Sequence, residues 1–328
     1  MTASSPASAS REWWRGLALV LLATLALSLQ NVLARVAQSP KGLAILGGIT
    51  QLGGYVDPGA NKLHISLLVL LLRVGFVVPI LWLILPAIKP GAWQEARQVL
   101  NGSDRGLKLR IITAGLLLFV SQTSIYLAIA SVGPATAVTI FFIYPTVTTL
   151  LAWRLFGERP SWQQWLAIAL IYVGCIWLSF SVPNAKFQGD LTGIATAVLS
   201  GVVFAMEGVI AQSCFSKINP ATFTGMIFTV ELIALSAVTL PFIPLDINSG
   251  LVLMGGLLCL ATLSGYLFNN FGIKTIGAAS TAIIGSSGPA VTALLGLVIL
   301  SDRLNLTQWE AILIVTIGVI LMNWAKSK

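Results

Sequence analysis

Three ionisable residues lie deep inside long apolar stretches of the sequence, where their side chains could do chemistry. Arg73 lies about ten residues into one stretch, Glu231 about eleven into another, and Glu207 within a third. A charged side chain in hydrocarbon costs about 2.5–3.5 kcal/mol, so these residues must face a protein interior. An alignment of Asn61 with Asn219 pairs Arg73 with Glu231. We expect this pair to contact a bound solute directly, or else to form a structural ion pair or bind backbone carbonyls.

Two prolines, Pro145 and Pro289, interrupt apolar stretches at equivalent positions, 144 residues apart. Each proline lacks an N–H and frees the carbonyl one helical turn earlier. At 1.5 Å of rise per residue, each lies about 16 Å into its stretch, near the middle of a bilayer. Paired interruptions of this kind mark the binding sites of membrane transporters, and the alternative is a pair of packing kinks.

Polar residues that lipid would not accept gather at the same depth. Ser286 and Ser287 precede the second proline, while Gln122 and Tyr266 lie midway along two other stretches. Close helix packing would explain the serines. It does not explain why Gln122, Tyr266 and Tyr144, which precedes Pro145, lie at the same depth. We predict a substrate-binding site formed by Arg73, Gln122, Tyr144, Pro145, Glu231, Tyr266, Ser286, Ser287 and Pro289.

Glu207 is equivalent to Gln30, which precedes it by 177 residues and has Asn31 beside it. The two equivalent residues lie in opposite halves of their stretches, which suits two gates better than one shared site. Of the two, only Glu207 can gain and lose a proton. We predict gating or proton coupling for Gln30, Asn31 and Glu207, and the alternative for Glu207 is a hydrogen-bonded packing role.

The composition places the whole chain in a membrane. Hydrophobic residues make up 56% of its 328 residues and charged residues 9%, against about 25% charged residues in soluble domains. The net charge of +8 does not indicate nucleic-acid binding, because the cations punctuate the ends of apolar runs instead of clustering on one face. The expected partners are therefore the lipid bilayer and a small molecule, with no nucleic acid.

The sequence contains no pattern typical of an enzyme or a metal site. Cys175, Cys214 and Cys259 lie far apart in apolar segments, and His64 is the only histidine. Such spacing suits neither zinc nor a disulfide framework. A nucleophile motif and a phosphate-binding glycine loop are also missing from the sequence. We therefore expect no enzymatic activity, no cofactor and no metal.

An internal repeat sets the domain organisation, because residues 129–178 return without a gap at 273–322. Apolar spans of about twenty residues must be helices, since backbone polar groups in hydrocarbon need internal partners. We predict an all-α integral membrane protein with ten transmembrane helices in two five-helix repeats, residues 15–182 and 190–325, after a disordered cytoplasmic tail at residues 1–14. The ten predicted spans are 15–36, 64–86, 110–130, 134–156, 162–182, 190–213, 220–243, 251–272, 277–300 and 306–325.

Five helices per repeat is an odd number, so the two repeats must be inverted relative to each other. With the N-terminus inside, thirteen cations fall on cytoplasmic segments and five on outer segments. This bias predicts that both termini are cytoplasmic and indicates the cell (inner) membrane. The long outer loop at residues 37–63 breaks the symmetry, either as a lid or as a tolerated insertion.

Several motifs resemble the EamA repeat of the drug/metabolite transporter superfamily. They include residues 126–135, Tyr144-Pro145, Gly157-Glu158-Arg159-Pro160 and Trp165 to Gly174, with second-half counterparts at 277–289 and 302–318. The sequence departs from the family where Ser301-Asp302 replaces the usual Gly-Glu. The resemblance implies secondary transport by alternating access, often export of amino acids or other small metabolites. It also implies a central cavity lined mainly by spans other than the fifth and tenth.

The predicted function is secondary active transport of small metabolites such as amino acids, in the export direction. A coupling proton is a possible partner, and the expected unit is a monomer. The alternative is an obligate exchanger of phosphorylated metabolites or nucleotide sugars, which would normally need more than one cation in the cavity. A non-transporting membrane sensor or scaffold is the alternative from a different class.

Overall fold

The computed structural model describes residues 6–37, 39, 41–55, 62–132, 134–180, 191–241 and 247–326. Most of these residues are helical, in α1 (Pro6–Ala37), α2 (Lys62–Ile88), α3 (Ala92–Asn101), α4 (Arg105–Val132), α5 (Pro134–Phe141), α6 (Tyr144–Phe156), α7 (Trp162–Phe180), α8 (Leu191–Cys214), α9 (Pro220–Thr239), α10 (Ser249–Ile276), α11 (Ala278–Gly285), α12 (Gly288–Leu300) and α13 (Leu306–Lys326). One small hairpin joins β1 (Leu43–Ile45) to β2 (Thr50–Leu52) through the 3-10 helix η1 (Leu46–Gly48).

Several of these helices are long and apolar enough to cross a bilayer. In the described part of the chain there are seven: Arg11–Ala37, Ile65–Ile88, Arg105–Ile129, Leu191–Cys214, Pro220–Thr239, Ser249–Ile276 and Ala278–Leu300. Two further apolar helices, Trp162–Trp177 and Leu306–Leu321, are shorter. Large apolar side chains such as Leu83 and Ile233 are exposed on the outside of the bundle. The protein is therefore a membrane protein built from apolar helices.

The structure differs from the sequence-based expectation at the N-terminus and in two connections. Helix α1 begins at Pro6 instead of residue 15, so residues 6–14 of the expected disordered tail are helical, as their alanines favour. Helix α3 and the β1–β2 hairpin lie in segments that were expected to be loops. Residues 1–5 of the tail, and the predicted span ends at 181–182 and 242–243, lie outside the described residues.

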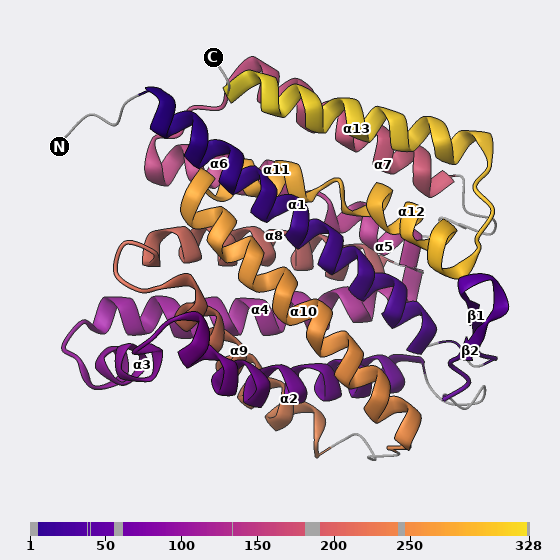
Figure 1. Ribbon diagram of the computed structural model, residues 1–328, viewed down its shortest axis with the longest axis horizontal. Coiled ribbons are helices and arrows are strands. Elements are labelled where there is room, and N and C mark those ends of the chain that lie inside the picture. The colour runs from indigo at the N-terminus through magenta and orange to yellow at the C-terminus, as the bar shows by residue number, and fades with distance from the viewer. Residues whose placement is uncertain are drawn as a thin grey trace.

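The helices form one bundle with two distinct ends (Figure 1). At one end lie α3, the start of α1 and the end of α13, and we call it the α3 end. The β1–β2 hairpin lies at the opposite end, which we call the hairpin end. The described chain therefore starts and finishes at the same end of the bundle.

The helix packing follows the internal repeat. Helix α4 packs along α8, and the equivalent pair is α10 with α1; α4 also contacts α9, and the equivalent pair is α10 with α2. Helix α2 contacts α9, and α7 packs along α13, so each of these two contacts pairs an element with its own equivalent. Exchanging the two halves of the chain therefore reproduces these packing pairs, whereas the contact of α6 with α11 has no counterpart of similar extent between α12 and α5.

Two equivalent glycines allow the close approach of α7 and α13, which lie together along one side of the bundle (Figure 1). A Cβ atom built at Gly174 would lie 3.0 Å from the carbonyl oxygen of Ala311. A Cβ built at Gly318 would lie 2.9 Å from Cγ1 of Ile171 and 3.2 Å from the carbonyl oxygen of Ala167. Membrane helices use small residues in this way because close packing replaces the missing hydrophobic driving force.

Gly318→Ala should therefore destabilise the protein, because the added methyl group overpacks a helix contact, at a cost of about 1–3 kcal/mol. The measurement is the midpoint of thermal unfolding in detergent. Gly256→Ala is the matched control, because a Cβ there meets no atom within 4 Å. Equal unfolding midpoints for the two variants would contradict this account of the α7–α13 contact.

Both predicted proline interruptions are real breaks in the helices. Helix α5 ends at Phe141, and α6 starts with Tyr144 and Pro145 in its first turn. Helix α11 ends at Gly285, and α12 carries Pro289 in its first turn. Proline is tolerated in the first turn of a helix because the N–H it lacks would have no intrahelical partner there.

Equivalent turns also end α6 and α12. Gly157 caps α6 in a left-handed conformation with φ of 72°, and Ser301 caps α12 with φ of 53°. Glycine adopts this region without strain, whereas a residue with a Cβ does not. The departure from the family motif at Ser301 is therefore a residue held in a strained backbone conformation.

Ser301→Gly should stabilise the protein by about 1 kcal/mol, because it removes the clash of Cβ with the backbone in the left-handed region. Thermal unfolding in detergent measures the change. The reciprocal variant Gly157→Ser should lower stability by a similar amount. A lower unfolding temperature for Ser301→Gly would show that the Ser301 side chain stabilises the protein by more than its left-handed backbone conformation destabilises it.

Candidate functional site

Three charged side chains lie in the interior of the bundle, and we call them the charged cluster. Arg73 of α2, Glu207 of α8 and Glu231 of α9 are 1%, 3% and 0% exposed, so they face neither lipid nor bulk water. The charge of Arg73 acts on Glu231, and the charge of Glu231 acts on Glu207. Residues that lie far apart in the sequence therefore share one electrostatic environment.

The charged cluster has few hydrogen-bond partners within the protein. Both carboxylate oxygens of Glu231, Oε1 of Glu207, and Nε and Nη2 of Arg73 are buried without a partner. The structural ion pair between Arg73 and Glu231, one of the alternatives that the sequence left open, is not formed, because neither side chain takes part in an ion pair of the described residues. Buried polar atoms are nearly always hydrogen-bonded, so a group of unpartnered ones indicates a place where a solute or a proton can bind.

Tyr266 of α10 and Gln122 of α4 extend this polar interior. Nε2 of Gln122 donates a hydrogen bond of 2.7 Å to the hydroxyl oxygen of Tyr266. The tyrosine ring packs edge-on against Phe228 of α9, with the ring centroids 5.0 Å apart. The charges of the whole cluster act on Tyr266. The structure thus brings these two predicted residues together with the charged cluster.

The two helix breaks meet each other inside the bundle. The Tyr144 hydroxyl donates a hydrogen bond of 3.2 Å to the carbonyl oxygen of Ala282, which joins α6 to α11. The Tyr144 ring packs against Phe141, Phe142 and Phe204. Pro145 is buried beside it. The two breaks therefore lie side by side, one from each half of the chain.

Ser286 and Ser287 are buried, but their hydroxyl groups bond locally. Oγ of Ser286 donates to the carbonyl oxygen of Ile283, and Oγ of Ser287 donates at 2.8 Å to that of Ile284. These carbonyls belong to the last turn of α11, where intrahelical partners are missing. The structure thus gives both serines a role in closing the end of a broken helix, next to Pro289.

Gln30 and Asn31 tie α1 to its neighbours. Gln30 accepts a hydrogen bond of 2.7 Å from the hydroxyl of Thr262 on α10. Asn31 is exposed and donates to the hydroxyl of Thr292 on α12 at 3.5 Å, the long limit for such a bond. The amide oxygen of Gln30 thus has a partner within the protein, whereas its equivalent Glu207 keeps an unpartnered oxygen.

A cavity of about 780 Å³ lies at the α3 end. Its walls come from the start of α1, the turn after α6, the end of α8 and the α10–α11 junction. Glu158, Arg159, Gln212 and Lys274 are among the residues that line it. The cavity therefore carries both positive and negative side chains.

Comparison with known proteins identifies the family. Residues 14–180 and 191–324 each match the model of the EamA-like transporter family. The chain belongs to the EamA-like transporter family. The protein named "Uncharacterized transporter sll1319" of Synechocystis sp. is 34% identical over 95% of this chain and 94% of its own length. "Uncharacterized transporter YwfM" of Bacillus subtilis is 24% identical over 56% of this chain and 62% of its own length.

A crystal structure of another protein has the same fold as this EamA-like transporter. The two superpose with a TM-score of 0.69 at 14% sequence identity, over 96% of this chain and 97% of the other. The two family matches fall on the two halves that the internal repeat defines. The expected family resemblance is thereby confirmed, and the relatives are named as transporters, not as enzymes.

Two residues of this EamA-like transporter that sequence analysis did not assign to any site interact at the α3 end. Nε2 of Gln212 donates a hydrogen bond of 2.7 Å to Oε1 of Glu158. The amide N–H of Ala278 donates at 2.6 Å to Oε1 of Gln212. The sequence signal was present in the motif around Glu158, but its partner lies on a different helix.

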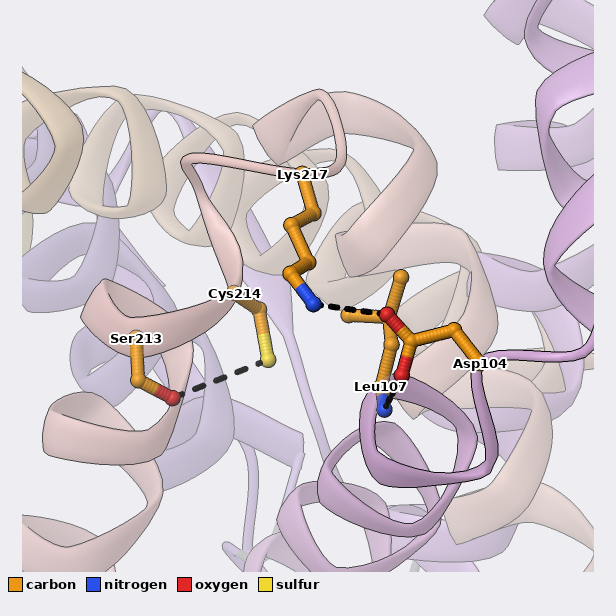
Figure 2. Close-up of polar contacts among 5 residues, drawn as sticks. All are labelled: Asp104, Leu107, Ser213, Cys214 and Lys217. Carbon is orange, nitrogen blue, oxygen red and sulfur yellow. Dashed lines mark hydrogen bonds and ion pairs between the residues drawn. The ribbon is translucent and has the colours of Figure 1, made fainter.

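The connection between α3 and α4 is also anchored at this end of the transporter (Figure 2). Nζ of Lys217 lies 2.7 Å from Oδ2 of Asp104, and the N–H of Leu107 donates to Oδ1. The hydrogen bond from the lysine lowers the pKa of the Asp104 carboxyl below its ordinary value. Because the pKa of this carboxyl is lower in the folded protein than in the unfolded chain, the contact stabilises the fold at pH values above the ordinary pKa. That stabilisation is lost as the pH falls through the lowered pKa of the folded protein.

Proposed function

We propose that this chain is a secondary active transporter that exports small metabolites, such as amino acids, by alternating access. The observation that carries the proposal is the charged cluster, buried within apolar helices and largely without protein partners. Ionisable residues inside membrane helices are costly, and they usually mark a substrate path or a proton relay. The proposed substrate-binding residues are those predicted from the sequence, and Gln30, Asn31 and Glu207 are proposed for gating or proton coupling.

Alternating access needs two halves that can exchange roles, and the packing supports this. The proposed architecture is ten transmembrane helices in two inverted repeats: the seven long apolar helices, the two shorter ones, and the broken pair α5 and α6. The exchange of packing pairs between the halves supports a two-fold relation. Since the helices of a single chain enclose the charged cluster, the proposed transport unit is a monomer.

The proposed orientation puts the α3 end in the cytoplasm of a cell whose inner membrane holds the protein. The segment from the end of α2 to the first turn of α4, at that end, carries Lys89, Arg97, Arg105 and Lys108. Cytoplasmic loops are enriched in such residues. Both termini would then be cytoplasmic.

The charged cluster gives little support to the alternative function of exchanging phosphorylated metabolites. Arg73 is the only buried cation in the described part of the chain. Recognition of a phosphate usually uses several charge-assisted hydrogen bonds. A carboxylate together with an ammonium group matches the mixed charges of Arg73, Glu207 and Glu231 better.

Untargeted metabolite profiling of cells and medium, with and without overexpression, tests the function and the direction together. We expect one class of small metabolites, amino acids first, to rise in the medium relative to the cells. Arg73→Gln should reduce this effect about tenfold or more, because a charge-assisted contact is worth about 1.5–3 kcal/mol. A change confined to phosphorylated compounds would favour the exchanger, and no change in any compound would favour a sensor or scaffold.

Reporter fusions or cysteine labelling should place residues 87–109 inside the cell and residues 38–62 outside. The physical reason is the excess of lysine and arginine on the cytoplasmic connections. Fusions that put both segments on the same side of the membrane would contradict the inverted-repeat architecture.

Glu207→Gln should abolish the dependence of flux on a pH gradient and leave passive exchange in place, because glutamine keeps the shape but cannot titrate. The assay is flux, in proteoliposomes, of the compound identified by profiling, with and without an imposed gradient. Gln30 at the equivalent position shows that the fold accepts glutamine there. Glu231→Gln is the parallel variant: gradient dependence kept in Glu207→Gln but lost in Glu231→Gln would move the coupling role to Glu231.

A further inference from the structure

Two polar contacts lie at opposite ends of the bundle, each between the end of a long helix and the turn after a broken one. At the hairpin end, Arg35 in the last turn of α1 lies 2.6 Å from Asp302, just after α12. At the α3 end, Gln212 in the last turn of α8 donates to Glu158, just after α6. We call these the hairpin-end latch and the α3-end latch.

The internal repeat relates the two latches to each other. The spacing of 177 that pairs Gln30 with Glu207 also pairs Arg35 with Gln212. The spacing of 144 that pairs the prolines also pairs Glu158 with Asp302. The same contact therefore occurs twice, once at each end, although one is an ion pair and the other joins an amide to a carboxylate.

The difference in chemistry between the latches follows from their neighbours. Gln212 makes a second contact besides the one with Glu158: its amide oxygen accepts a hydrogen bond from the N–H of Ala278. At the hairpin end the residue equivalent to Ala278 is Pro134, which has no N–H to donate. An arginine side chain has no acceptor and needs none there. Each latch residue therefore suits the donors and acceptors at its own end.

We infer that the two latches close the two ends of the transport pathway in turn, so that opening one end breaks one latch while the other holds. This inference rests on the proposed alternating-access function. The hairpin-end latch is partly exposed, with side-chain exposures of 56% for Arg35 and 33% for Asp302. Exposed ion pairs are weak enough to break in every cycle. The α3-end latch lines the cavity at its own end, as a gate should.

Two reporter cysteines can follow the opening of each end. Thr149 lines the cavity at the α3 end, and Ala293 is its equivalent near the middle of α12, the helix that precedes Asp302 of the hairpin-end latch. Each of Thr149→Cys and Ala293→Cys is placed in a full-length protein whose native cysteines are replaced by alanine. The labelling rate with a membrane-impermeant maleimide is measured in intact cells and in inside-out vesicles.

The latch variants should shift the two reporters in opposite directions. Arg35→Gln weakens the hairpin-end latch, so Ala293→Cys should label about twofold to fivefold faster and Thr149→Cys slower, as expected for an exposed ion pair. Gln212→Ala should produce the reverse. Gln212→Arg with Ala278→Pro copies the hairpin-end chemistry onto the α3 end, so it should shift labelling in the same direction as Arg35→Gln.

The control is Lys217→Gln, which removes another exposed ion pair of almost the same length, 2.7 Å, at the α3 end (Figure 2). It should leave both labelling rates unchanged. Equal shifts in the control, or shifts of Arg35→Gln and Gln212→Ala in one direction, would overturn the inference. Flux of the profiled compound is followed in the same vesicles. If the latch variants leave the labelling rates unchanged while flux is intact, the latch inference alone is refuted. If the latch variants shift labelling in opposite directions but no compound is transported, the transport proposal alone is refuted.

Discussion

The helical backbone of this protein follows from one constraint: inside hydrocarbon, every backbone N–H and C=O must find a partner within the protein. Long apolar helices meet this requirement by themselves, but the breaks between α5 and α6 and between α11 and α12 do not. Those breaks lie against each other in the interior, where Tyr144 donates to a carbonyl of α11 and Ser286 and Ser287 bond the end of that helix. Irregular backbone is thus confined to the place where protein groups can satisfy it.

The same constraint explains where the charged side chains lie. Arg73, Glu207 and Glu231 come from three helices whose outer faces are apolar, so packing those faces toward lipid turns the charges inward. The unpartnered atoms of the charged cluster cost free energy that a purely structural interior would avoid. In a transporter this cost has a use. If every polar atom of the site were already hydrogen-bonded within the protein, none would be left to bind a solute.

Exchange of the two halves preserves most of the helix packing but not the chemistry. Glycines at the α7–α13 contact recur in both halves, since packing depends on shape. Charge differs at equivalent positions: Arg73 against Glu231, and Arg35 against Gln212. A transporter meets different solutions on its two sides. It therefore needs the same helix arrangement in both halves but different polar groups in each half, as the pairs Arg73/Glu231 and Arg35/Gln212 provide.

Hydropathy, the internal repeat and proline chemistry are local properties of the chain, so the sequence by itself determined the membrane class, the family, the two halves and the breaks near Pro145 and Pro289. Helix α3 and the hairpin escaped this reasoning because short elements depend on what they pack against. Only the tertiary structure decided that Arg73 and Glu231 form no ion pair, that Ser286 and Ser287 bond locally, and that Gln212 meets Glu158. The rotation and axial position of each helix set the distances between side chains, and packing across the whole bundle determines both.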